Sequence, residues 1–239
     1  AIPATGHSPA GLYVHAGSEQ LLFDAGAGTA QRLRAIGVTL RQLDRIFLTH
    51  FHIDHCLDLI SILFALRIPH PARTKPLTVY GPRGLRRLSH RLNQAFHRQL
   101  KPNTYRLALK ELDETVLRGP GYRVLTRRMN HSTAALGYRL EAHGRSVVYS
   151  WDTDVCDGIV QLAQHADLLI LECSMPDERK VRGHLTPTEC GLIADAARCR
   201  HLVLTHFYPM FQGYDIRRRV RRAFHGRVTL ARDGSVFHL

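Results

Sequence analysis

A short histidine-rich stretch determines most of what the sequence predicts, and it holds four potential metal ligands within six residues: His50-Phe51-His52-Ile53-Asp54-His55. It directly follows the apolar segment 45–49, which we interpret as a buried strand. In an extended chain, residues two apart share a face, so His50 and His52 can hold one ion. Asp54 and His55 follow as the chain turns into the next helix, and they can face a second ion. Imidazole and carboxylate ligands suit Zn²⁺, and also Mn²⁺ or Fe²⁺.

Further ligands are expected elsewhere, because one short loop cannot complete the coordination shells of two ions. Three more apolar runs lead to a potential ligand: 124–125 to His131, 147–149 to Asp152, and 202–204 to His206. The segments 46–51 and 202–207 both end in Leu-Thr-His-Phe. A match this short is weak evidence of duplication, but it indicates that two strands end alike, with a histidine.

Short apolar runs alternate with helical patterns along the whole chain, and no long linker separates them. Strands are predicted at 21–24, 45–49, 77–80, 122–126, 136–140, 147–149, 168–171 and 202–204. Helices are predicted at 30–36, 57–66, 85–100, 159–164, and from the cap at Thr186 through Ala197. A closing hairpin is predicted from Val228–Leu230 and Val236–Phe237 around an Asp-Gly turn. This alternation indicates one α/β domain over residues 1–239.

The motifs together resemble the metallo-β-lactamase superfamily, through its H-x-H-x-D-H signature at 50–55. The segment 22–26, Leu-Phe-Asp-Ala-Gly, is similar to the family's early strand and glycine turn. The segment 150–153, Ser-Trp-Asp-Thr, is similar to the S-G-D-T element of the ribonuclease Z and phosphodiesterase branch, with Trp151 at the usual glycine. The segment 183–186, Gly-His-Leu-Thr, is similar to that branch's G-H-x-T element, and Leu204-Thr205-His206 to its last metal ligand.

The resemblance implies a single-domain αββα four-layer sandwich that binds two divalent metal ions, with Zn²⁺ expected first. Motif matching assigns one ion to His50, His52 and His131, and the other to Asp54, His55 and His206. Asp152 would bridge the two ions, together with a water or hydroxide. His184 matches a histidine that approaches the substrate. Asp24 either orients a ligand histidine or caps the turn before Gly26.

The implied reaction is hydrolysis by the bridging hydroxide, which would attack phosphorus while two cations roughly 3.5–4 Å apart stabilise the entering and leaving oxygens. Asp54 would orient the hydroxide or accept its proton. His184, if protonated, would stabilise the phosphoryl oxygens or donate a proton to the leaving group.

The expected function is a phosphodiesterase that acts on phosphodiesters or cyclic nucleotides. One alternative is a ribonuclease Z that matures transfer-RNA 3′ ends. That family typically inserts a long arm between the elements that match His131 and Asp152, and only 20 residues separate them here. Hydrolysis of an ester, thioester or lactone by the same centre is a second alternative, and a non-catalytic or nucleic-acid-binding module is a third. Because the bulky Trp151 stands where the family has glycine, the substrate class of the family does not carry over directly to this chain.

Net charge and composition indicate which binding partners and which cellular compartment to expect. The 239 residues carry a formal net charge of +13, and residues 59–110 contain eleven Lys or Arg but no Asp or Glu. Such a surface favours anionic substrates, with nucleic acid as a further candidate.

The five cysteines form no C-x-x-C pair, no apolar run is long enough to span a membrane, and no signal peptide is visible. We therefore expect a cytoplasmic protein without a membrane partner. Homodimers are common in the resembled branch, and the apolar segment 60–66 is a candidate interface.

Overall fold

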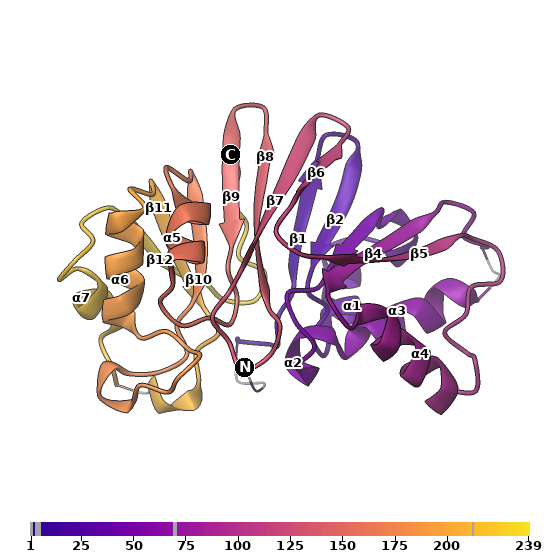
Figure 1. Cartoon of the computed structure of the whole chain (residues 1–239), viewed down its shortest axis with the longest axis horizontal. Helices are drawn as coiled ribbons and strands as arrows, with labels where there is room; N and C mark the ends of the chain where they lie inside the picture. The colour runs from indigo at the N-terminus through magenta and orange to yellow at the C-terminus, as the bar shows by residue number, and fades with distance from the viewer. Residues whose placement is uncertain (1, 3–5, 69–70, 212) are drawn as a thin grey trace. The chain divides into compact units, whose positions relative to one another are not determined.

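The computed structural model describes residues 2, 6–68, 71–211 and 213–239, which form two compact units. One unit comprises residues 8–112, and the other comprises residues 113–239 together with 1–7. In the described residues each unit is built around one β-sheet (Figure 1). The sequence predicts an αββα four-layer sandwich of the α/β class, and the structure confirms a mixed α/β fold with two sheets. The extent of the domain, 1–239, stays a prediction.

The unit 8–112 contains a five-stranded sheet in the order β1-β2-β3-β4-β5, in which β1 and β2 are antiparallel and the other neighbours are parallel. Its strands are β1 (Leu12–Ala16), β2 (Glu19–Phe23), β3 (Arg45–Phe47), β4 (Leu77–Pro82) and β5 (Leu107–Leu112). Its helices are α1 (Thr29–Ala35), α2 (Ile53–Cys56), α3 (Asp58–Arg67) and α4 (Leu85–Ala95), with a 3-10 turn at Leu40–Gln42.

Helix α3 supplies much of the core of this unit. Leu59, Ile62, Leu63 and Leu66 follow helical spacing and are buried against the sheet residues. The apolar segment 60–66 therefore packs mainly inside its own unit, with Phe64 as its exposed apolar residue. A homodimer stays a prediction.

The other unit contains a seven-stranded sheet in the order β12-β11-β10-β9-β8-β7-β6. The strands from β9 to β12 are parallel neighbours, and those from β6 to β9 are antiparallel. The strands are β6 (Val116–Gly119), β7 (Tyr122–Arg128), β8 (Leu136–Ala142), β9 (Arg145–Tyr149), β10 (Leu168–Glu172), β11 (His201–Thr205) and β12 (Arg227–Leu230). The helices are α5 (Asp157–Ala163), α6 (Pro187–Ala196) and α7 (Ile216–Val220), with 3-10 turns at Asp177–Arg179 and Pro209–Phe211.

Helix α6 begins where its sequence signal predicts. Thr186 is the N-cap, its hydroxyl accepts the backbone N–H of Glu189, and the Glu189 carboxylate accepts the N–H of Thr186. This reciprocal capping box, with Pro187 in the first turn, satisfies N–H groups that a helix start leaves without intrahelical partners. It also fixes the end of the 183–186 segment, which carries His184.

The predicted hairpin after residue 228 is wrong. Strand β12 pairs in parallel with β11, and Val236–Phe237 forms no strand. The turn does form, since Ser235 donates its backbone N–H to the Arg232 carbonyl. The Phe237 ring then packs edge-on against His201, at 5.7 Å between centroids, instead of returning along the sheet.

Helix α4 is shorter than predicted, because it ends at Ala95 rather than near residue 100. His97 and Arg98 adopt left-handed φ angles of 48° and 62°. The Arg98 N–H bonds the Asn93 carbonyl at 2.7 Å, so the chain leaves the helix by a tight turn. Leu100, the last apolar residue of the pattern, is still buried in the core.

Within the ranges that the structure describes, no helix combines the length and the hydropathy that crossing a membrane requires.

Candidate metal centre

Polar residues of the candidate site lie at or beyond the carboxyl ends of neighbouring parallel strands in each unit. In the unit 8–112, β2 and β3 are parallel neighbours, and Asp24 and His50 follow them. In the other unit, β9, β10 and β11 are parallel neighbours, and Asp152, Glu172 and His206 lie at or just past their ends. Carboxyl ends of parallel strands meet at one edge of a sheet, so strand order brings these side chains together within each unit.

Asp24 is fully buried and connects the ligand segment of the first unit. Its carboxylate accepts the Thr49 backbone N–H at 2.7 Å and the Thr49 hydroxyl at 2.9 Å. The same carboxylate accepts a hydrogen bond from His55 Nδ1 at 3.0 Å. The backbone of Asp24 has a φ of 59°, which lies in the left-handed region that Asp tolerates better than most residues. Of the two roles that the sequence left open for Asp24, the contacts support the orientation of a ligand histidine.

These bonds assign the tautomers of two ring systems. The single hydroxyl proton of Thr49 points to Asp24, so the hydroxyl oxygen accepts from His50 Nδ1 at 3.1 Å. His55 likewise donates from Nδ1 to Asp24. Both rings are therefore protonated on Nδ1, as the hydrogen-bond pattern assigns it, and each Nε2 carries the lone pair that a metal needs.

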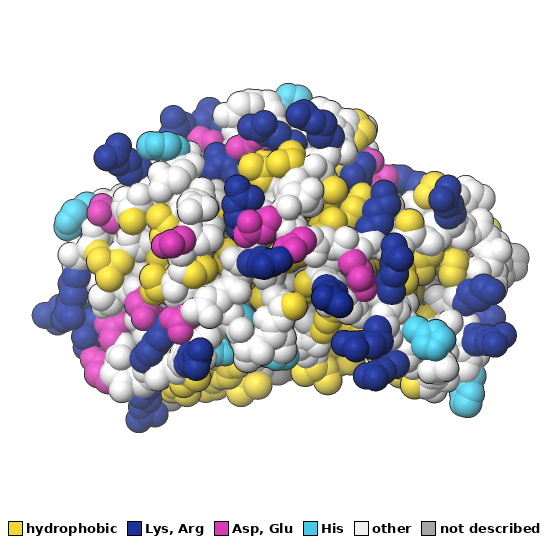
Figure 2. Space-filling view, in the orientation of Figure 1, with side chains coloured by type: hydrophobic (Ala, Val, Ile, Leu, Met, Phe, Trp, Pro, Cys, Tyr) yellow, Lys and Arg dark blue, Asp and Glu magenta, His cyan; other side chains and the backbone are white. Residues whose placement is uncertain are grey.

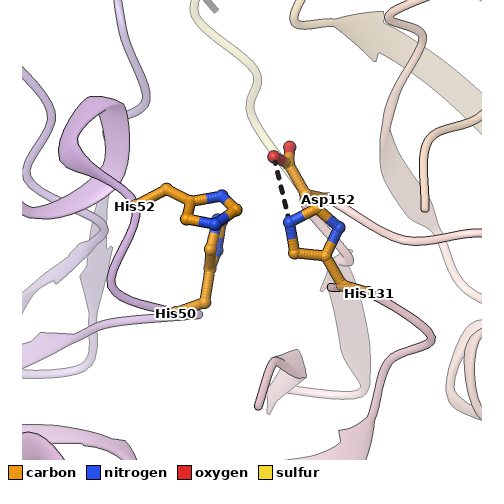
Figure 3. A group of neighbouring side chains, drawn as sticks. All are labelled: His50, His52, His131 and Asp152. Carbon is orange, nitrogen blue, oxygen red and sulfur yellow. Dashed lines mark ion pairs between the residues drawn. The ribbon is translucent and has the colours of Figure 1, made fainter. Parts of the chain in front are cut away.

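The remaining members of the motif lie next to these rings. His52 is the N-cap of α2, and its ring centroid lies 4.6 Å from that of His50. One ring nitrogen of each lies within 4.8 Å of the other, a separation suited to two ligands of one ion (Figure 3). Asp54 lies in the first turn of α2, where its carboxylate is 3.4 Å from His55 Nε2 and about a quarter exposed.

The unit with residues 113–239 contributes His131 and Asp152. His131 Nδ1 donates to the Gly183 carbonyl at 2.9 Å, which again leaves the lone pair on Nε2. His131 Nε2 lies 3.8 Å from Asp152 Oδ2, as the dashed line in Figure 3 marks. Gly183 has a φ of 86°, and a Cβ at this position would lie 3.1 Å from His131 Nδ1. The glycine therefore permits both the turn and the close approach of the ring.

Glu172 holds His206 through a hydroxyl. The Glu172 carboxylate is fully buried and accepts both the backbone N–H and the hydroxyl of Ser174. Because that hydroxyl donates to Glu172, its oxygen accepts from His206 Nδ1, at 2.7 Å. His206 Nε2 thereby carries the lone pair of the ring, and it lies 3.4 Å from Asp152 Oδ1.

Glu172 also holds His184 directly. His184 Nδ1 lies 3.1 Å from Glu172 Oε1 and 4.0 Å from Asp152 Oδ2. Burial lowers the pKa of the His184 imidazole, but the hydrogen bond and charge of Glu172 outweigh burial, so the pKa is raised above its ordinary value. The pairing therefore favours the protonated ring that the sequence-based mechanism requires.

The two units use the same arrangement. In each, a buried carboxylate reaches one histidine through a hydroxyl and a second histidine directly. Asp24 reaches His50 through Thr49 and bonds His55; Glu172 reaches His206 through Ser174 and bonds His184. The repeated Leu-Thr-His-Phe segments carry His50 and His206, but the hydroxyl that reaches the histidine is Thr49 of the repeat in one unit and Ser174, outside the repeat, in the other.

Trp151 stands where the resembled S-G-D-T element has glycine, and its backbone keeps a conformation that glycine favours. Its φ of 44° lies in the left-handed region. The ring is buried and meets His206 edge-on, at 5.3 Å between centroids, and it also packs on Tyr149. The Trp151 ring therefore covers one side of the His206 imidazole.

Each predicted ligand lies beside others of its own unit. The unit 8–112 brings together His50, His52, Asp54 and His55, and the other unit brings together His131, Asp152 and His206. Asp152, Glu172, His184 and His206 offer ligand atoms within 4.8 Å of one another. Imidazoles that are bonded through Nδ1, together with buried carboxylates, form a donor set that fits a divalent cation.

Glu172 belongs to the candidate site but was not predicted from the sequence. The signal was present, because Glu172 follows the apolar run 168–171 just as the predicted ligands follow other runs. Ser174 carries no comparable signal, since its role depends on a bond to a histidine 32 residues away.

Comparison with known proteins agrees with the fold and the motifs. The family model of the β-lactamase superfamily domain matches residues 19–207, and the chain belongs to this family. A ribonuclease Z of Streptomyces avermitilis is 29% identical, with 97% of this chain and 92% of that protein covered. The short form of human tRNase Z is 26% identical, with a TM-score of 0.81 and coverage of 100% of this chain and 95% of that one. The metallo-β-lactamase fold protein YhfI of Bacillus subtilis is 24% identical, with a TM-score of 0.84 and coverage of 98% and 93%.

The expected superfamily and its ribonuclease Z-like branch are thus confirmed, and so is the metallo-β-lactamase fold. The chain is a hydrolase of this fold, with a His/Asp cluster suited to divalent metal.

Proposed function

We propose that the chain is a binuclear metal-dependent phosphodiesterase. One ion would be held by His50, His52 and His131, and the other by Asp54, His55 and His206, with Asp152 as the shared ligand. The observation that carries this proposal is the fixed tautomer of the four histidines 50, 55, 131 and 206. Each bonds a partner in its own unit through Nδ1, so each presents Nε2.

Two ions account for the donor set better than one. A single zinc site takes about four ligands, of which a catalytic site draws three from the protein. Seven donors exceed that number, and their division into His-rich and Asp-containing groups suits two ions. Zn²⁺ is the first candidate, and Mn²⁺ or Fe²⁺ would accept the same nitrogen and oxygen ligands.

The bound ions would lower the pKa of water and offset negative charge on the phosphoryl oxygens. The chain's own residues account for the proton transfers. Asp54, on the partly exposed turn of α2, would accept a proton from the attacking water. His184, held by the buried Glu172 carboxylate, would donate a hydrogen bond or a proton to the leaving oxygen.

The substrate class follows from charge and from the relatives. The net charge of +13 favours a phosphodiester over a neutral ester. The relatives named ribonuclease Z favour RNA 3′-end cleavage as the second candidate function. The alignment with the Streptomyces avermitilis protein runs over 289 positions, more than the 239 residues of this chain, so that relative carries inserted residues. In this chain the short β8–β9 hairpin lies in the interval between His131 and Asp152.

We also propose a cytoplasmic location. The five cysteines are all free, which suits a reducing compartment.

The decisive experiment combines metal analysis with a substrate panel. The purified protein is assayed for bound metal and for turnover of bis(p-nitrophenyl) phosphate, a cyclic nucleotide, a precursor transfer RNA and a lactone, before and after chelation. About two equivalents of metal with chelator-sensitive phosphodiester turnover is the expected result. Turnover of the lactone alone would overturn the phosphodiesterase assignment. Failure to bind metal after reconstitution would overturn the whole proposal.

A further inference from the structure

The outward face of helix α4 and the turn after it is strongly basic. Each lysine and arginine of segment 83–101 is exposed: Arg83, Arg86, Arg87, Arg91, Arg98 and Lys101. His90 and His97 are exposed among them. In Figure 2, Lys and Arg side chains gather over the part of this face where Figure 1 draws α4. We call this set of residues the α4 basic surface.

Few of these charges are neutralised by the protein. Among the residues that the structure describes, Arg87, Arg91 and Arg98 have no ion pair or side-chain hydrogen bond. A second basic surface, the groove beside the β8–β9 hairpin that is lined by Arg123, Arg139, Arg145 and Arg200, differs in this respect. There Glu141 pairs with Arg123 and Arg139, and Asp167 pairs with Arg145 and Arg200. The α4 basic surface thus keeps its positive charge, whereas carboxylates of the protein neutralise much of the positive charge in the hairpin groove.

The arrangement of the arginines does not serve the helix itself. Arg87 and Arg91 lie four residues apart in α4, so two like charges are neighbours on one side of the helix. Arg86 and Arg87 also lie in the first turn, where the helix dipole disfavours cations. The helix start is stabilised instead by Glu111, whose carboxylate accepts the N–H groups of Gly84 and Arg86 at 3.0 and 3.1 Å. The charges of Arg83 and Arg86 favour the Glu111 carboxylate, but folding gives no reason for Arg87 and Arg91.

The apolar side of α4 is already used. Leu85 is buried, and Leu88 and Leu92 pack against the core of the same unit. A helix that inserts into lipid presents an apolar face to the membrane, and α4 turns that face inward. The exposed side is left to bind by charge, which suits a polyphosphate backbone better than a bilayer.

The α4 basic surface also adjoins the ligand motif within its own unit. Phe51 lies between His50 and His52, and its ring packs on the turn that begins α4. A Cβ on Gly81 or Gly84 would lie 3.4 or 3.5 Å from ring atoms of Phe51. A polymer that follows the arginines of α4 toward the helix start therefore arrives at the segment that carries two proposed ligands.

We propose that the α4 basic surface binds the phosphate backbone of an RNA substrate. The inference rests on the proposed function, since it supplies the binding surface for a phosphodiester that extends beyond the scissile bond. Arginine and lysine that neutralise phosphates release counterions, so binding should weaken steeply with salt.

The test compares two triple variants of the full chain. In the first, Arg87, Arg91 and Arg98 are changed to Gln, which keeps a comparable helix propensity. In the matched control, Arg218, Arg221 and Arg222 at α7, which are equally exposed, are changed to Gln. The probe is a fluorescently labelled hairpin RNA with a single-stranded 3′ tail, and its affinity is measured by anisotropy over a series of KCl concentrations. Turnover of bis(p-nitrophenyl) phosphate and circular dichroism are measured in parallel.

The α4 variant should bind RNA at least about tenfold more weakly, with a salt dependence reduced by up to roughly 2–3 in the log–log slope. Its turnover of the small diester and the affinity of the α7 control should stay unchanged. Unchanged RNA affinity in the α4 variant, or an equal loss in the α7 control, would overturn the proposal. Binding to phosphatidylserine vesicles without binding to RNA would also overturn it. Absence of diester turnover in the unmodified protein would instead refute the proposed function, because the anisotropy assay needs no catalysis.

Discussion

In each unit a hydroxyl joins a buried carboxylate to a histidine, and we call this arrangement a hydroxyl relay. Replacement of Ser174 by alanine tests whether such a relay sets the metal affinity. The substitution removes the oxygen that joins Glu172 to His206, so the His206 Nδ1–H loses a partner at 2.7 Å in a buried place. A buried donor left without a partner costs about 1–3 kcal/mol of stability. Loss of a group that orients a ligand histidine costs roughly 10–100-fold in metal affinity. We expect both effects, measured by thermal unfolding of the metal-free protein and by competition with a chelator of known affinity.

Ser146→Ala provides the matched control. Ser146 is also buried, and its hydroxyl also bonds a carboxylate, that of Asp167 at 3.2 Å, but no site histidine is involved. The control should lose stability and keep its metal affinity, whereas Ser174→Ala should lose both. If the two variants bind metal equally well, the relay does not orient His206 and the reasoning is refuted.

Three further predictions concern single residues. Asp54→Ala should abolish diester hydrolysis while circular dichroism stays native, because the partly exposed carboxylate contributes little to the core; turnover near that of the unmodified protein would exclude its catalytic role. His184→Ala should lower turnover more than bound metal, and elemental analysis that finds an equal loss of metal would make His184 a ligand. Gly26→Ala should destabilise the unit 8–112 by more than about 3 kcal/mol, the scale of severe strain and overpacking, because its Cβ would lie 2.1 Å from the Asp54 carbonyl oxygen; a melting temperature within a few degrees of the original would contradict this.

The strands and helices that the sequence predicted correctly are those with strong burial. The run 168–171 became β10, in which all five residues are buried, and the Thr186 signal became the cap of α6. The strands that were not predicted, β1, β5 and β6, have mostly exposed or half-buried residues, so their apolar pattern is weak. Helix α7 was missed for the same reason, since only Ile216 and Val220 are buried among its arginines.

The proposed ligands could be found from the sequence, and the groups that orient them mostly could not. Ligands such as His50 and His131 lie near strand ends, and that position is visible in a one-dimensional pattern. Ser174 and the Gly183 carbonyl act on histidines 32 and 52 residues away, so their roles depend on tertiary packing. The assignment of ligands to two ions remains a proposal that the metal analysis above will test.

The contact between Trp151 and His206 gives this protein an intrinsic optical reporter. Trp151 is the only tryptophan of the chain, and it is 5% exposed. All indole fluorescence therefore originates from one ring, 5.3 Å from a proposed metal ligand. Charging or metallating that imidazole changes the electrostatic field at the indole, so emission can follow metal loading without a label. The same signal follows unfolding, because the ring passes from a buried wall into water.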